Sequence, residues 1–442
     1  MLSRFRCWSS PGCWLPLWIL MVATATLDVC PAAGAERDRA AEWPRFRGPG
    51  GDGVAAADPA QVPLRWGPDQ NVQWRCETPG EGWSSPVVGR GKVFLSAAIK
   101  RPEDAESSRD SEQLDLSVVI IDAKSGDIQR VATLFSQDLS DAPGIHSKNS
   151  HASPTPILDG DRLYVHFGHL GTACCDLEGN VIWTQRSLRF PPTHGNGGSP
   201  VLVDGKLIFT CDGSRDPYVA ALNAADGSVA WRTPRPVDAE RKFSFATPTL
   251  ITVDGQQQVI APGSDCVLAL EPSSGRILWQ VRYDGYSVVP KPLFAGGLIY
   301  LSTGYNRASL LAIRPDGSGD VTDTHVVWRV DKSVSKTPSP TAAEDLLFLI
   351  SDDGIAVCIE QASGDVVWRQ RLGGNFSASP VRIGDRLYAT DESGVTSVIG
   401  AGREYRLLAE NDLQERVLAS MAVAAPALYL RTDKALYRLQ KP

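Results

Sequence analysis

SPVLVDGKLIFTCDGSRDPYVAALNAADGSVAWR, residues 199–232, decides the fold, because it reads as one complete four-stranded β unit. Turn residues separate its short β runs, and Asp204-Gly205 is typical of a tight hairpin. A unit of this kind cannot bury both of its faces alone, whereas copies packed face to face can, so the interpretation requires copies elsewhere. Within the stretch we expect strands at Val201–Val203, Lys206–Cys211, Tyr218–Asn223 and Ser228–Arg232.

Copies of this unit occur along most of the chain. Clear ones cover residues 153–183, 247–280 and 339–369, and weaker ones begin near residues 84, 291, 379 and 420. Most starting points are 40 to 48 residues apart, the length of one propeller blade, and the first step of 68 residues must contain an insertion. The sequence therefore predicts an all-β, eight-bladed β-propeller of four-stranded blades, a single unit despite its 442 residues.

The two ends of the repeat region complement each other. Residues 71–78 resemble a fourth strand with no strands before it, and residues 419–439 supply three strands with no fourth after them. We expect the N-terminal strand to pair with the C-terminal three, so that the ring closes within one blade and leaves no open edge. The propeller then covers residues 71–442, and an extended segment at 36–70 precedes it, with residues 42–54 lying across the propeller surface.

Residues 1–35 have the layout of a secretory signal peptide. Arg4 and Arg6 precede an apolar run at residues 14–27 and small residues follow, so we expect cleavage near Ala35 and export to the periplasm or cell envelope. The apolar run is short for a membrane span, and an uncleaved anchor is the alternative. Lipidation of Cys30 is a further alternative, although the residues before it match that signal poorly. Peripheral membrane association is also possible for such a chain.

Composition excludes several classes of function. The net charge is −7 and no basic block occurs, which argues against nucleic-acid binding. Most of the six cysteines beyond the leader lie in apolar strand runs, in different blades, so we expect buried free thiols rather than disulfides. No zinc spacing, P-loop or serine-hydrolase motif is present, and the polar insertion at residues 100–115 is expected to be surface decoration. We expect a monomer.

A tryptophan pattern accompanies the turn between the third and fourth strand of each unit. In the quoted stretch it reads Ala221-x-Asn223-x3-Gly227-x3-Trp231. The glycine adopts the left-handed turn conformation, and the tryptophan packs a large flat face on the adjacent blade while its N–H finds a carbonyl. Blade one carries Arg130 instead. The pattern predicts structural docking tryptophans at Trp74, Trp183, Trp231, Trp279, Trp328 and Trp368.

These residues resemble the tryptophan-docking motif of the PQQ-like β-propeller repeat family, over roughly residues 43–439. That family includes the quinoprotein dehydrogenases and also the BamB-like outer-membrane assembly proteins, which have the propeller without the cofactor. The resemblance implies one of two functions. The first is an exported, non-catalytic scaffold that binds a protein or small ligand at the channel mouth, with no cofactor. The second is a PQQ-dependent quinoprotein oxidoreductase acting on alcohols or sugars, with PQQ and calcium.

Adjacent cysteines are a hallmark that the resemblance would connect to quinone binding, through a vicinal disulfide. Cys174-Cys175 is adjacent, but it falls in an expected strand, where successive side chains point to opposite faces and the sulfurs diverge. No motif in the sequence matches the calcium ligands or the catalytic aspartate of the dehydrogenases. We therefore favour the scaffold, predict no catalytic residues and no metal site, and keep the oxidoreductase as the alternative.

Five of the six histidines lie between residues 146 and 194, in connections that should share one face of a propeller. We hypothesise that they gather at one mouth of the channel, in a polar pocket that takes a metal, an anion or a substrate. The alternative, which the lack of any metal-ligand spacing favours, is that each histidine only caps its own loop. The residues predicted to form the pocket are His146, Asn149, His151, His169, His194, Asn196 and Asp212.

Overall fold

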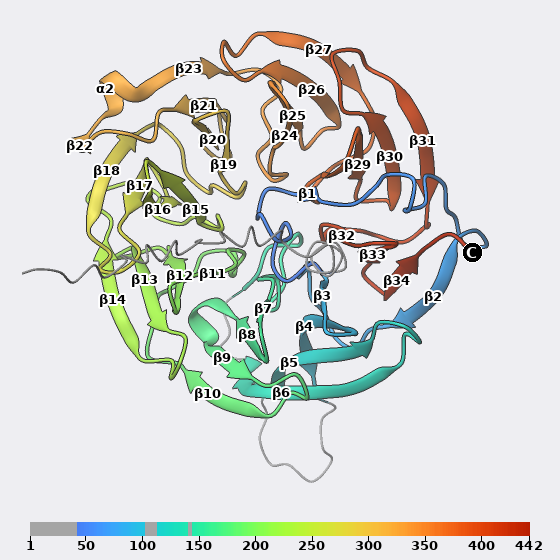
Figure 1. Ribbon diagram of the computed structural model, residues 1–442. Helices are drawn as coiled ribbons and strands as arrows, with labels where there is room; N and C mark the ends of the chain where they lie inside the picture. Colours follow the sequence, from blue (N-terminus) through green and yellow to red (C-terminus); the bar gives the residue numbers. More distant parts are fainter. Residues whose placement is uncertain (1–41, 102–112, 140–143) are drawn as a thin grey trace, which may run out of the picture.

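Eight β-sheets surround a central channel in the computed structural model, which describes residues 42–101, 113–139 and 144–442 (Figure 1). Within each four-stranded blade the neighbouring strands are antiparallel, and the first strand of each blade lies next to the channel. The predicted eight-bladed propeller of four-stranded blades is confirmed. The expected signal peptide at residues 1–35, its cleavage near Ala35, Cys30 and most of the insertion at 100–115 lie outside the described residues.

The first four blades follow the chain in order. Their strands are β3 (Val87–Gly89), β4 (Lys92–Lys100), β5 (Gln113–Asp122) and β6 (Ile128–Asp138); β7 (Ile157–Asp159), β8 (Arg162–His166), β9 (Thr172–Cys175) and β10 (Val181–Gln185); β11 (Val201–Val203), β12 (Lys206–Cys211), β13 (Tyr218–Asn223) and β14 (Val229–Pro234); β15 (Thr249–Val253), β16 (Gln256–Pro262), β17 (Cys266–Leu270) and β18 (Ile277–Arg282).

The last four blades continue in the same way. Their strands are β19 (Leu293–Ala295), β20 (Leu298–Ser302), β21 (Leu310–Ile313) and β23 (Val326–Val330); β24 (Thr341–Ala343), β25 (Leu346–Ile350), β26 (Ile355–Glu360) and β27 (Val366–Arg371); β28 (Val381–Ile383), β29 (Arg386–Thr390), β30 (Val395–Gly400) and β31 (Leu407–Asp412); β32 (Ala422–Ala424), β33 (Ala427–Arg431), β34 (Ala435–Leu439) and β2 (Val72–Glu77).

Four short elements in the described part of the chain add to this ring. Two of them are short parallel strands. β1 (Val54–Ala55) pairs with β28 on the channel side, and β22 (Gly319–Asp320) pairs with β18 on the outer side. The other two are single helical turns, η2 (Gly168–Leu170) and α2 (Thr322–His325). Among the residues described, no helix has the length and apolar character needed to cross a bilayer.

The ring closes through the pairing of the two chain ends. Strand β2 pairs antiparallel with β34, with Trp74 opposite Arg438 and Glu77 opposite Ala435. Figure 1 shows blue β2 beside red β34 near the C-terminus. The predicted closure is confirmed, and it gives the outer edge of the last three-stranded fragment a partner.

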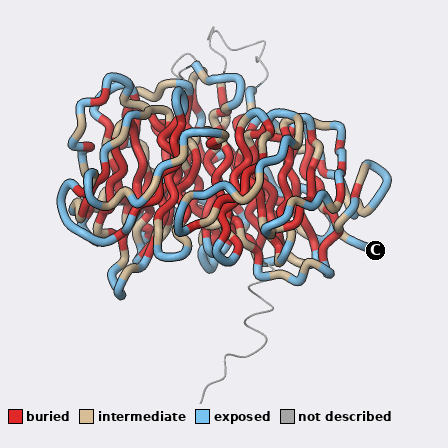
Figure 2. Tube along the Cα trace, turned by 90° about the horizontal axis from the view of Figure 1, so that it is seen from above, coloured by how far each residue is buried: buried red, intermediate tan, exposed pale blue. Residues whose placement is uncertain are grey.

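The hydrophobic core lies between neighbouring blades rather than inside any one of them. Between the third and fourth blades, for example, Ile208 and Val219 pack in one cluster with Val259 and Leu268, and all four are fully buried. Figure 2 shows these buried strands through the middle of the disc, with exposed loops on both of its faces. Each blade is therefore stabilised by its neighbours, which is why the repeat needs a closed ring.

The six tryptophans of the repeated pattern connect consecutive blades. Gly227, at φ 74°, lies against the ring of Trp183 so closely that a Cβ would come within 2.4 Å of it, so the turn requires glycine. Arg130 stands at this position in blade one and donates to Asn180 Oδ1 at 2.9 Å instead. The Nε1–H groups donate over 2.9–3.3 Å to carbonyls of the next blade: Trp74 to Ala123, Trp183 to Ala224, Trp231 to Pro272, Trp279 to Pro315, Trp328 to Gln361 and Trp368 to Gly402.

The segment before β2 differs from the extended surface strip that we expected at residues 42–54. Residues 46–51 form consecutive turns, and Arg47 is buried, with its guanidinium donating to the carbonyls of Pro340 and Pro380 at 2.7 and 3.2 Å. Lys291 Nζ donates to Gly51 O at 2.6 Å. Glycines with positive φ let this stretch coil, and Arg47 binds carbonyls directly before the inner strands, so the segment fills part of the channel (Figure 1).

Candidate functional site

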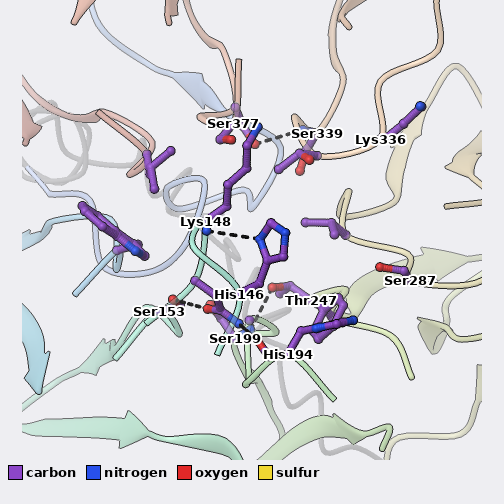
Figure 3. Close-up of a pocket in the computed structure, with 18 of the residues that line it drawn as sticks. His146, Lys148, Ser153, His194, Ser199, Thr247, Ser287, Lys336, Ser339 and Ser377 are labelled. Atoms are coloured by element: carbon purple, nitrogen blue, oxygen red, sulfur yellow. Dashed lines mark hydrogen bonds between the residues drawn. The ribbon is translucent and has the colours of Figure 1, made fainter. Parts of the chain in front are cut away.

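A cavity of about 630 Å³ opens at one mouth of the channel. Its walls are the connections that lead into the first strand of each blade and the loops between second and third strands, and Phe46 of the N-terminal segment also lines it. Figure 3 shows these side chains converging from several blades. The propeller geometry explains the gathering, since these two kinds of connection lie on one face.

Three of the seven predicted pocket residues meet in this cavity. The rings of His146 and His194 lie nearly perpendicular with centroids 5.9 Å apart, and the backbone N–H of His146 donates to His194 O at 3.3 Å. Asn149 Nδ2 donates to the same carbonyl at 2.9 Å. His194 holds a φ of 65°, so its loop is bent sharply to present the imidazole. Both imidazoles line the cavity.

The other four predicted residues do not line the cavity. His169 and Asn196 are buried beside each other, with 2.8 Å between His169 Nδ1 and Asn196 Nδ2. Burial, followed by the nearby charge of Arg189, lowers the pKa of His169 to about 4, so this imidazole is neutral at physiological pH. His151 is half-buried, and burial lowers its pKa as well.

Asp212, the remaining predicted pocket residue, has a structural partner. Both of its carboxylate oxygens accept from Arg235 at 2.7 Å, and both side chains are almost completely buried. The Arg235 guanidinium also donates to the carbonyls of Ala261 and Pro262 in the next blade. The pair therefore joins two blades. The seven residues do not form one pocket, because burial of a loop side chain depends on how the loop bends, which spacing does not encode.

Phe243, Phe245 and Tyr286 line the cavity beside the two histidines, and we call these three residues the aromatic wall. It was not predicted from the sequence. The Phe243 ring lies 5.4 Å from that of His194 and 5.7 Å from that of Tyr286. Arg241 stacks over Tyr286 at 4.5 Å, and Lys336 lies 5.2 Å from the centre of the Tyr305 ring. The alternation Phe243-Ser-Phe245 directly before a blade start was a signal that could have revealed part of this wall.

The rim of the cavity carries more cations than free carboxylates. Lys148 pairs with Glu392 at 2.6 Å. Asp352 accepts from the Lys336 amide at 2.7 Å and from Thr337 Oγ1 at 2.6 Å. Both acids are thus engaged, whereas neither Lys336 nor Arg241 has a carboxylate within ion-pair distance in the described part of the chain. The mouth is cationic and aromatic.

Hydroxyl groups from six blades encircle the cavity at the positions where the inner strands begin. We call them the hydroxyl ring. Each hydroxyl oxygen accepts a hydrogen bond, at 2.9–3.0 Å, from one backbone N–H at the start of the inner strand of the preceding blade. Lys291 takes this place in blade five. In blade two the place belongs to Thr155, two residues after the Ser153 at which we expected the copy to start. The ring consists of Thr155, Ser199, Thr247, Ser339, Ser379 and Ser420.

The donor set does not fit the calcium and PQQ arrangement that the quinoprotein resemblance implies. Within the described ranges, no three His, Cys, Asp or Glu side chains come close enough to hold a metal ion. Cys174 and Cys175 are buried in two different hydrophobic clusters, on opposite sides of β9, and neither lines the cavity. Burial raises their pKa values to about 11 and about 12, so both are inert thiols. All six described cysteines are free and buried.

A closed ring of eight four-stranded sheets joined by tryptophans defines the class of the PQQ-repeat propellers. The family model described as "Outer membrane protein assembly factor BamB" matches residues 215–439, just over half of the chain. The chain therefore belongs to this family.

Individual relatives carry the same description. The outer membrane protein assembly factor BamB of Moranella endobia is 24% identical over 327 residues, covering 69% of this chain and 75% of the relative. That of Yersinia pestis is 22% identical over 221 residues, covering 47% of this chain and 51% of the relative. The match thus spans about half the length of the second relative.

Solved structures show the same architecture. The crystal structure of BamB from Moraxella catarrhalis superposes with a TM-score of 0.54 at 14% identity, covering 84% of this chain and 99% of that one. A europium-containing methanol dehydrogenase superposes with a TM-score of 0.58 at 9% identity, covering 91% of each chain. Likenesses at these identities show the fold alone, because one propeller hosts both scaffolds and enzymes.

Proposed function

We propose that this chain is an exported, non-catalytic scaffold of the cell envelope that holds a protein partner at the mouth of its channel. Membership of the BamB family supports the scaffold role, and the relatives' names connect them with outer membrane assembly. We place the chain in the periplasm or on the envelope, with Glu36 as the first residue after removal of the leader.

The cavity at the mouth is the observation that carries the proposal. Its volume of about 630 Å³ lies within the range of pockets that bind ligands, and aromatic residues with scattered polar groups are the usual lining of such sites. In the described residues, none of its serines hydrogen-bonds a histidine, so the pairing that activates a nucleophile is missing. The lining is suited to binding rather than to covalent catalysis.

The quinoprotein alternative has no comparable support. The likeness to a methanol dehydrogenase concerns the fold, and among the described residues no three His, Cys, Asp or Glu side chains cluster as a metal site. We therefore propose that the chain works without a resident cofactor or metal.

The experiment places a photo-reactive amino acid at the rim of the cavity in the source cells. Tyr305 is 58% exposed and lines the cavity, so p-benzoylphenylalanine at this position reports what occupies the mouth. The matched control carries the same group at Val327, which is 47% exposed on an outer strand. We expect a cross-link to an outer membrane assembly protein from residue 305 and none from residue 327. Cell fractionation and N-terminal sequencing check the export.

Two results would overturn the proposal. Equal cross-linking from residues 305 and 327 would mean that the mouth has no special role. Recovery of the full-length chain in the cytoplasm would contradict the envelope location.

A further inference from the structure

The hydroxyl ring has a directional property that follows from its hydrogen bonds. Each ring oxygen accepts an amide N–H from the preceding blade, and none of the six hydroxyls donates its own proton to a protein group in the described residues. All six side chains are more than nine-tenths buried, and all six line the cavity. The O–H groups are therefore available to donate to whatever enters the cavity.

Accepting an amide also makes each hydroxyl a better donor, because hydrogen bonds in a chain polarise one another. Several O–H groups that line one cavity suit an acceptor with more than one lone pair. Hydrogen bonds to an ionised acceptor are roughly twice as strong as those to a neutral one. The ring is thus matched to an anion better than to a cation, for which hydroxyl oxygens already engaged by amides are poor ligands.

The charged side chains at the rim of the cavity also favour an anion. Lys336 and Arg241 line the cavity with no carboxylate partner among the described residues, and Asp352 already accepts three hydrogen bonds. An incoming anion therefore meets two unpaired cations and no unoccupied carboxylate. Figure 3 shows Lys336 at the edge of the same cavity into which Ser339, Ser199 and Thr247 project.

We propose that the cavity recognises a carboxylate, seated on the hydroxyl ring, and that the aromatic wall formed by Phe243, Phe245 and Tyr286 takes the apolar group attached to it. This inference rests on the proposed function, since it names the chemical group that the mouth binds. The carboxylate comes either from a free organic acid or from the C-terminus of a peptide chain.

Isothermal titration calorimetry of the purified chain with matched pairs of probes tests the proposal. The first pair is 3-phenylpropionate and its uncharged amide, and the second is the peptide Ala-Gly-Ala-Gly-Leu with a free or an amidated C-terminus. We expect each acid to bind at least about tenfold more tightly than its amide, and the affinity of the acids to fall as salt is added. If the peptide with a free C-terminus binds more tightly than 3-phenylpropionate, the carboxylate comes from a chain terminus. If the two acids bind with equal affinity, it comes from a free organic acid.

Rim variants test which groups are responsible without disturbing the blades. Lys336→Gln combined with Arg241→Gln should weaken binding of the acids about tenfold or more and leave the amides unaffected. Lys332→Gln, at an exposed position of the same connection, is the matched control and should change nothing. Ser379→Ala should weaken binding of the acids further, with circular dichroism to check that it folds, because it leaves the Ser339 amide without its acceptor.

The proposal is overturned if the amides bind as tightly as the acids, if the double rim variant keeps full affinity for the acids, or if no probe binds in the millimolar range. Each of these results leaves the cross-linking at residue 305 unaffected. A failed carboxylate site is therefore distinguishable from a failed scaffold.

Discussion

Lys291 is the residue whose replacement tests our account of the channel most directly. It takes the place of a ring hydroxyl in blade five, its side chain is buried, and Nζ donates to Gly51 O at 2.6 Å. Burial, followed by the nearby charge of Arg47, lowers the pKa of Lys291 from 10.5 to about 7. Because the folded protein disfavours the charged amine, we expect Lys291→Met to stabilise the protein at neutral pH.

The direction in which the free energy of unfolding changes with pH follows from proton binding to the folded and unfolded states. Between pH 7 and pH 10.5 the unfolded chain binds a proton at Lys291 that the folded protein does not bind. The free energy of unfolding therefore rises with pH through this window, and the penalty is fully present below pH 7. From the pKa of 10.5 in the unfolded chain and about 7 in the folded protein, the penalty for charging Lys291 is about 5 kcal/mol at low pH and about 2 kcal/mol at pH 9.

Methionine removes this penalty while keeping a similar side-chain volume. It also loses the hydrogen bond to Gly51, which costs about 1 kcal/mol. We expect Lys291→Met to raise the free energy of unfolding by about 3 kcal/mol at pH 7 and by about 1 kcal/mol at pH 9. Guanidinium unfolding at both pH values measures this, with Lys332→Met as the exposed control, which should match the parent protein at each pH.

Comparison of the variant with the parent at each pH cancels the other groups that titrate in this range, including Arg431, whose pKa burial lowers to about 9. A variant less stable than the parent at pH 7 would contradict the reasoning. So would a stability difference that is the same at pH 7 and pH 9, because Lys291 would then be charged in the channel.

Three further predictions concern the joints between blades and the cofactor. Trp231→Phe removes the donor to Pro272 O and should lower the free energy of unfolding by about 1–2 kcal/mol in guanidinium titrations. Asp212→Asn leaves the buried Arg235 charge uncompensated and should cost about 3–5 kcal/mol, whereas Asp238→Asn, in an exposed ion pair, should leave the unfolding midpoint unchanged. Titration with PQQ should give the same heat with and without calcium and no dye-linked oxidation of alcohols or sugars; calcium-dependent binding with turnover would contradict the scaffold.

The repeat allowed the fold to be predicted almost strand by strand. The expected strands at Val201–Val203, Lys206–Cys211 and Tyr218–Asn223 are β11, β12 and β13, and β14 differs by one or two residues at its ends. Turn residues and strand periodicity are local signals, and eight copies average out their errors. Ring closure was predictable for a similar reason, since the missing fourth strand at one end matched the spare strand at the other.

The N-terminal segment and the pocket were harder to predict because they depend on non-local geometry. The Gly-rich stretch at residues 42–54 predicts an extended segment on the propeller surface, whereas the burial of Arg47 depends on carbonyls of Pro340 and Pro380, far away in the sequence. The histidines are close in sequence, yet His169 turns into the wall while His194 faces the cavity. The hydroxyl ring did have a sequence signal, since Ser or Thr precedes Pro at most blade starts, but its meaning requires the neighbouring blade.

The same hydrogen bonds that join the blades also prepare the cavity. A ring hydroxyl such as Ser339 satisfies the amide of the preceding blade, and this contact orients its oxygen so that the proton is left for a ligand. Blade five departs from the rule with Lys291, which instead reaches the N-terminal segment at Gly51. That segment fills part of the channel and contributes Phe46 to the lining of the cavity. Phe46 of this segment therefore belongs to the lining of the proposed binding site, and we expect Phe46→Ala to weaken binding there.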